Sequence, residues 1–143
     1  MRSTSPTKPV FLLVAALLAA ATAVTAQDSP PVTTCDLRNG RAWTTWSQST
    51  KFVYLAGIAD AMVREEAQSG TRSVLRDYFA ANATYAEVAS GIDKIYEDSA
   101  NATLPIIDAL SAFCQRANGM PPAKLEDEMA RVRRQWRERG CGK

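Results

Sequence analysis

The sequence predicts an all-α fold, a small bundle of four main helices plus one short helix. In four separate stretches, apolar residues recur at the three- and four-residue spacing that places them on one helix face. No stretch shows the sustained alternation of β-branched residues that is typical of strands. With 143 residues, of which 46% are hydrophobic and 22% charged, the chain has the composition of one globular domain.

The first 26 residues show the three parts of a secretory signal peptide. Arg2 and Lys8 give a positive start, residues 10–21 are apolar and Ala-rich, and small residues precede a cleavage site between Ala26 and Gln27. The alternative, a transmembrane anchor, needs about 20 apolar residues, whereas the whole stretch from residue 10 to residue 26 has 17 residues and includes two threonines. We expect cleavage, export to the periplasm or beyond, and no stable membrane anchor in the mature protein.

Signal cleavage changes the charge balance. The chain has 17 basic and 15 acidic residues, and two of the basic ones lie in the signal, so the mature protein carries 15 of each sign. Residues 131–143 are rich in arginine, while acidic residues occupy 126–128. This polarity favours a final helix whose charges complement its own dipole. A basic patch for nucleic acid or anionic lipid is the alternative, and we expect no nucleic-acid partner.

The absence of histidine excludes several kinds of catalytic site. A Ser-His-Asp triad, a Cys-His dyad and a His-containing zinc site all require imidazole. Paired carboxylates remain available for glycoside hydrolysis, but a helical protein of this size offers such pairs by chance. We interpret Asp60 and Asp93 as solvent-facing or capping groups, and expect a non-enzymatic protein without cofactor or metal.

After a flexible lead-in at 27–40, residues 41–143 are expected to form a single helical domain. The first helix should run over 41–68, with a glycine at Gly57 that would allow close packing against a helix over 85–96 containing Gly91. A short helix is expected from Ser73 to Ala80. Thr84 and Glu87 form a capping box before the 85–96 helix.

Two further helices complete the expected bundle. Pro105 should occupy the first turn of the next helix, which ends at Asn118-Gly119. Pro121-Pro122 opens the last helix, with one apolar stripe formed by Leu125, Met129, Val132 and Trp136.

Three cysteines in an exported chain suggest one disulfide and one spare thiol. A bridge from Cys35 to Cys114 would tie the start of the chain to the penultimate helix, and this is the pairing we favour. Sequence alone does not fix the pairing; Cys114–Cys141 is the main alternative, and three free thiols would also fit.

Trp43, Trp46 and Asp60 are the candidate partner-binding residues. Exposed together, the two tryptophans would form the kind of hot spot that Trp dominates; buried, they would seal one end of the bundle, which is the commoner arrangement. Asn82 and Asn101 each begin an N-glycosylation acceptor pattern, which is used only in a eukaryotic secretory route. The same two stretches are also typical of helix caps.

Residues 52–60 (FVYLAGIAD) resemble the aromatic-aliphatic-x-Gly-x-x-Asp helix of the Rap/Tai type immunity proteins. The helix start at 84–87, the turn at 98–101 and the stretch 106–110 before Cys114 are similar to the same layout. This resemblance covers roughly residues 43–114. It implies a small exported, all-helical bacterial protein that neutralises an effector delivered by type VI secretion.

The chain departs from that family in two respects. Family members often carry one cysteine within or just before the Gly-containing helix and another in the following loop, whereas residues 46–84 contain no cysteine. The C-terminal helix that begins at Pro121-Pro122 is additional.

We therefore expect an exported protein that binds a protein partner, with immunity to an effector as the most specific form. It would occlude the active site of the partner through a helical surface. The alternatives are a periplasmic structural or stress protein, and a small helical carrier of a lipid or other apolar ligand between its helices. An apolar internal cavity would favour the carrier.

Overall fold

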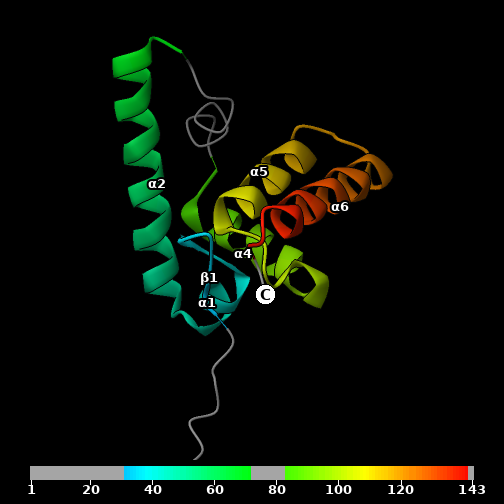
Figure 1. Ribbon diagram of the computed structural model, residues 1–143. Helices are drawn as coiled ribbons and strands as arrows, with labels where there is room; N and C mark the ends of the chain where they lie inside the picture. Colours follow the sequence, from blue (N-terminus) through cyan, green and yellow to red (C-terminus); the bar gives the residue numbers. More distant parts are fainter. Residues whose placement is uncertain (1–30, 72–82, 142–143) are drawn as a thin grey trace, which may run out of the picture.

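The computed structural model describes residues 31–71 and 83–141 (Figure 1). Within these ranges the main helices are α2 (Gln48–Ser69), α4 (Tyr85–Tyr96), α5 (Ile106–Ala117) and α6 (Pro122–Glu138). This confirms the all-α class and its four main helices. The short helix expected from Ser73 to Ala80 lies outside the described residues.

Helix α4 lies at the centre of the described structure (Figure 1). It contacts α1 (Gly40–Thr45), α2 and α5, while α6 packs on α5. The predicted capping box begins α4: Thr84 Oγ1 accepts from the Glu87 N–H at 3.2 Å, and Glu87 Oε2 accepts from the Thr84 N–H at 2.8 Å. After this cap, the buried side chains of α4 form the expected stripe, which consists of Val88, Ala89, Ile92, Ile95 and Tyr96.

The expected helix over 41–68 is two helices, α1 and α2. Trp46 leaves the helical conformation, with ψ at 144°, and Ser47 caps α2 by accepting from the Thr50 N–H at 3.2 Å. A serine whose hydroxyl can bond to the backbone competes with helix continuation, and here it starts a new helix. The break lets α1 and α2 contact α4 at different places.

Residues 33–38, which we expected to belong to a flexible lead-in, form a small hairpin. Strand β1 (Thr33–Thr34) pairs antiparallel with β2 (Leu37–Arg38), and Thr34 lies opposite Leu37. The turn residues Cys35 and Asp36 both have positive φ, 45° and 66°, as a two-residue turn that matches the twist of a hairpin requires. The expectation of a lead-in up to residue 40 is therefore wrong for this segment.

Asn39 joins the hairpin to α1 and is almost completely buried. Its Oδ1 accepts from the N–H groups of Arg41 and Ala42, which caps α1, and its Nδ2 donates to Thr34 Oγ1 at 3.2 Å. Thr34 Oγ1 in turn donates to the Thr103 carbonyl at 2.6 Å. The hairpin is thereby attached to the connection between α4 and α5.

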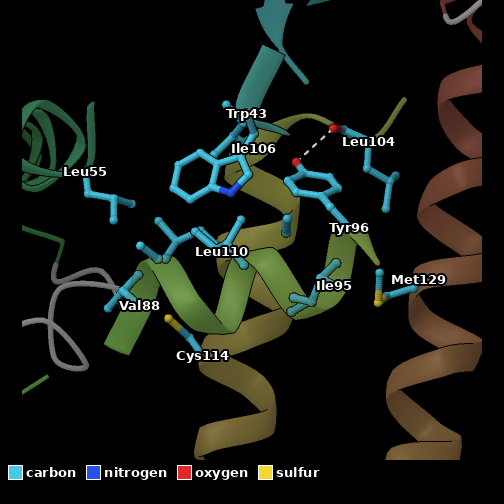
Figure 2. Close-up of a cluster of buried hydrophobic side chains, with 14 of the residues drawn as sticks. Trp43, Leu55, Val88, Ile95, Tyr96, Leu104, Ile106, Leu110, Cys114 and Met129 are labelled. Carbon is cyan, nitrogen blue, oxygen red and sulfur yellow. Dashed lines mark hydrogen bonds between the residues drawn. The ribbon is translucent and has the colours of Figure 1, made fainter. Parts of the chain in front are cut away.

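The core surrounds α4 and includes side chains from each described helix longer than three residues. Figure 2 shows the Trp43 ring in this cluster, with Leu55 of α2 to one side and Tyr96 of α4 to the other. The Tyr96 hydroxyl donates to the Leu104 carbonyl at 3.1 Å, so its polar end is satisfied inside the core. Met129 of α6 completes the cluster on the far side of Ile95 (Figure 2).

The disulfide joins Cys35 to Cys141, with a Cα–Cα distance of 5.4 Å. After α6, Gly140 takes a φ of 75° and the Cys141 N–H bonds to the Trp136 carbonyl, the pattern of a Schellman turn. This turn carries Cys141 to the hairpin. The predicted Cys35–Cys114 pairing is wrong, because Cys114 lies on the buried face of α5 as a free thiol. A disulfide of this kind is typical of oxidising compartments.

Gly57 and Gly91 do not pack against each other, so the predicted close approach of their helices at these two positions is wrong. A methyl group added at Gly57 would meet open space, whereas one added at Gly91 would collide with the ring of Phe113 on α5. Gly91 thus permits the close packing of α4 on α5, while Gly57 is an exposed glycine inside a helix.

Alanine at these two glycines should change stability in opposite directions. Gly57→Ala should raise the free energy of unfolding by about 0.5–1 kcal/mol, because alanine is the better helix former and nothing obstructs its methyl group. Gly91→Ala should lower it by about 1–3 kcal/mol through overpacking against Phe113. Urea unfolding of both variants checks this, and equal effects at the two positions would contradict the packing described here.

Removing the disulfide should destabilise the protein strongly. The bridge closes a loop with a sequence separation of 106 residues, and a loop of about 100 residues contributes roughly 4–5 kcal/mol in the chain-entropy model. A double variant, Cys35→Ser with Cys141→Ser, should lose about this amount in urea unfolding. Peptide mapping of the unreduced protein should give a linked Cys35–Cys141 pair, with Cys114 alkylated only after unfolding; a Cys35–Cys114 peptide would refute the assignment.

Candidate functional site

The N-terminal half of α2 is held to α4 by a cluster of one carboxylate, one ammonium and one indole. Asp93 Oδ1 accepts from Trp43 Nε1 at 2.6 Å and from Lys51 Nζ at 2.7 Å. The ammonium also lies 5.1 Å from the centroid of the Trp43 ring, within range of a cation–π interaction. The Lys51 side chain is 11% exposed and that of Asp93 41%, so the lysine is the more deeply buried partner.

Trp43 is therefore a core residue. Its exposed fraction is 0%, and its indole N–H is fully engaged by Asp93. The prediction of Trp43 as a partner-binding residue is wrong, because its ring seals the end of the bundle, the alternative considered from sequence. Asp93 is partly exposed, in line with the expectation of a solvent-facing group, but its carboxylate also pairs with Lys51 and Trp43, which sequence analysis did not predict.

Trp46 lies at the edge of this cluster and keeps part of its surface open. Its ring centroid is 6.0 Å from that of Trp43 and 5.0 Å from that of Tyr54, and both pairs are tilted. Burial raises the pKa of Tyr54, an effect that the nearby Arg38 opposes. Trp46 and Tyr54, unlike Trp43, present aromatic surface from which a partner could gain binding energy.

Asp60 lies on the side of α2 that faces away from α4. Val53, Gly57 and Asp60 recur at the spacing of one helix face and are exposed, as is Val63 beside them. We call these four residues the outer face of α2. Asp60 has no hydrogen-bond or ion-pair partner among the described residues, and Val53 is 73% exposed.

A pocket of about 310 Å³ lies between α5 and α6. Its apolar lining comes from Leu104, Ala112, Met129 and Val132. Its polar lining is Asp108, Ser111, Gln115, Glu128, Arg131, Gln135 and Arg139, together with the indole of Trp136. Sequence analysis did not anticipate this pocket.

Asp108 and Trp136 form the best-defined polar contact of the pocket. Asp108 Oδ2 accepts from Trp136 Nε1 at 2.7 Å, and the Arg139 guanidinium lies 5.1 Å from the centroid of the Trp136 ring. Burial raises the pKa of Asp108, although the indole hydrogen bond and Arg139 act in the opposite direction. On the neighbouring turn Arg131 pairs with Glu128.

Two further side chains with possible chemistry, those of Cys114 and Asn101, are buried. Burial raises the pKa of the Cys114 thiol to about 11, which leaves it protonated at neutral pH and a poor nucleophile. Asn101 is 4% exposed, and its amide donates to the Ile95 carbonyl while Oδ1 accepts from Arg133, so the folded protein does not offer it for glycosylation. Asn82 lies outside the described residues.

Neither a metal-binding cluster nor a membrane-spanning helix is found in the described part of the chain. Over 31–71 and 83–141, no three His, Cys, Asp or Glu side chains gather as metal ligands would. In the same ranges no helix combines the length and the apolarity that crossing a bilayer demands.

No protein-family model, curated protein or solved structure gives a significant match to this chain. The resemblance to Rap/Tai type immunity proteins stays a prediction.

Replacing the Asp93 carboxylate by an amide should weaken the attachment of α2 to α4. Asp93→Asn leaves the buried Lys51 ammonium without a counter-ion, which we expect to lower the free energy of unfolding by about 1–3 kcal/mol. Adding Lys51→Met should recover part of the loss, because an apolar replacement removes the unpaired charge. Urea unfolding of the two single variants and the double variant measures the coupling.

Glu97→Gln is the matched control, since it removes an exposed negative charge at the end of the same helix. It should change the unfolding free energy by less than about 0.5 kcal/mol. Equal effects of Asp93→Asn and Glu97→Gln would show that the cluster does not stabilise the fold.

Proposed function

We propose that this protein is exported and binds a protein partner through the outer face of α2, as an immunity or inhibitor protein does. The observation that carries the proposal is the exposure of Val53 and Val63 on that face, on either side of Asp60, which has no partner among residues 31–71 and 83–141. The function needs no catalytic group, cofactor or metal.

The helix gives this face a rigid support. With 22 residues, α2 is about 33 Å long at 1.5 Å per residue. Its opposite side is fixed to α4 through Leu55, Met62 and the Lys51–Asp93 ion pair. A rigid helix that presents apolar side chains loses little conformational entropy on binding.

The chemistry of the face favours one kind of partner. Exposed valines and the flat surface at Gly57 suit an apolar partner surface that approaches closely, and the carboxylate of Asp60 suits an arginine or lysine at its centre. The partly buried Trp46–Tyr54 pair lies near the start of α2 and adds aromatic surface there. We infer a basic-apolar patch on the partner, such as the rim of an effector's active site.

Export is supported by two independent features. The first 26 residues have the pattern of a cleavable signal, and the Cys35–Cys141 disulfide suits an oxidising compartment. A partner that acts in the periplasm or outside the cell would meet the protein there.

The test is to express the protein together with exported effector-like proteins encoded beside its gene and to measure growth and complex formation. The wild type should protect cells and bind the effector with a defined Kd. Val53→Ser and Asp60→Lys should each weaken binding at least about tenfold, which corresponds to about 1.4 kcal/mol, while thermal unfolding stays nearly unchanged.

Asp127→Lys on α6 is the matched control, since it makes the same charge reversal at another exposed position. It should leave affinity and protection unchanged. Deleting residues 1–26 should abolish protection but not binding by the purified protein, whose exported form should begin at Gln27. Failure of every neighbouring effector to bind, or binding that survives both α2 substitutions, would refute the proposal.

A further inference from the structure

The exposed side of α2 carries a stripe of residues that continues through most of the helix. Its members recur at alternating spacings of four and three residues, and all of them are exposed; they are Val53, Gly57, Asp60, Arg64 and Ala67. This is the spacing at which residues of one helix lie along another helix. We call these residues the α2 stripe; the first three also belong to the outer face of α2.

The two charged residues of the α2 stripe have opposite signs and no partner in the part of the chain that the structure describes. Asp60 and Arg64 are about one helical turn apart, yet no ion pair joins them, and neither bonds to another described side chain. Both charges are therefore available to complementary charges on another molecule.

The order of residues along the α2 stripe makes it complementary to itself in an antiparallel pair of helices. When a two-fold axis passes at the level of Met62, residues equally distant from that level face each other. Asp60 of each copy then faces Arg64 of the other, and Gly57 faces Ala67. In a parallel pair each residue would face its own counterpart, so that carboxylate would meet carboxylate and guanidinium would meet guanidinium, which is repulsive.

The α2 stripe also has room for a second helix. A methyl group added at Gly57 would meet no atom within 4 Å, and Ala67, which would lie opposite this glycine, has a short side chain. The distance between two packed helices depends on the size of the side chains at the contact, so these two positions allow a close approach. Val53, which is 73% exposed, would then lose contact with water.

We propose that α2 pairs with α2 of a second copy of this protein, antiparallel, through the α2 stripe and two reciprocal Asp60–Arg64 ion pairs. The stripe contributes far fewer residues than the roughly 20–30 a side of a stable interface, so the dimer is weak and exchanges with the monomer. A second copy and a protein partner on the outer face of α2 exclude each other. The dimer needs this chain alone and does not rest on the proposed function.

Sedimentation equilibrium of the full mature protein tests the dimer at protein concentrations from about 10 µM to about 1 mM, where weak complexes form. The wild type should show a monomer–dimer equilibrium that shifts toward monomer as salt is added. Asp60→Arg and Arg64→Asp each place like charges opposite each other and should raise the dimer Kd at least about tenfold. The double variant restores opposite charges, and its Kd should lie within about threefold of the wild-type value.

Asp127→Arg is the matched control, since it makes the same charge reversal at an exposed position of α6. It should leave the dimer Kd unchanged, and thermal unfolding shows that each variant is folded. Three results would overturn the proposal: a wild type that stays monomeric at the highest concentration, a dimer that persists in both single variants, or a double variant that does not recover.

The double variant also separates the dimer from the proposed function. It should keep the dimer but lose effector binding, because an arginine replaces the carboxylate that would meet the basic patch of the effector. A protein that does not dimerise can still bind an effector, and one that binds no effector can still dimerise. Failure of either proposal is therefore recognised without the other.

Discussion

The connection between α4 and α5, residues 97–105, holds together parts of the chain that are distant in sequence. The carbonyl groups of Ala102 and Leu104 accept from the first N–H groups of α1, and that of Thr103 accepts from the Thr34 hydroxyl. Residues 101–105 of this connection are buried or half-buried and must pair their backbone polar groups, and here the N-terminal segment supplies the donors. This requirement fixes the position of the hairpin and of α1, on which the rest of the described structure depends.

The position of α1 in turn determines how α2 is held. Because α1 begins at the connection, Trp43 enters the core above α4 and its N–H reaches Asp93 (Figure 2). Lys51, in the first turn of α2, bonds to the same carboxylate oxygen. A single carboxylate of α4 therefore orients two helices. It holds α2 by one side only, which leaves the outer face of α2 available to a partner.

Local features of the fold could be predicted from sequence, and contacts between distant segments could not. The capping box at Thr84 and the stripe of α4 depend on residues three or four apart, so sequence alone was sufficient. The end of α1 at Trp46 was missed because the apolar spacing continues through it, although Ser47 was a visible signal of a helix start. The bond between Trp43 and Asp93, 50 residues apart, and the pairing of Cys35 with Cys141 depend on how helices meet. For the same reason, no sequence pattern indicated the pocket between α5 and α6.

The way α6 is attached explains why the α5–α6 pocket stays open. A space beside small residues is ordinarily reduced when the neighbouring helix moves inward, but α6 is tethered through its C-terminal half and the turn that follows it. Arg133 bonds to Asn101 in the α4–α5 connection, Trp136 bonds to Asp108, and Cys141 is joined covalently to Cys35. These polar and covalent contacts set the distance between α5 and α6, and the side chains of Ser111 and Ala112 are too short to fill it. Hydrogen bonds and a disulfide that lie outside the apolar lining therefore keep the pocket open. Because the space is already formed, a ligand that entered it would not incur the free-energy cost of opening it.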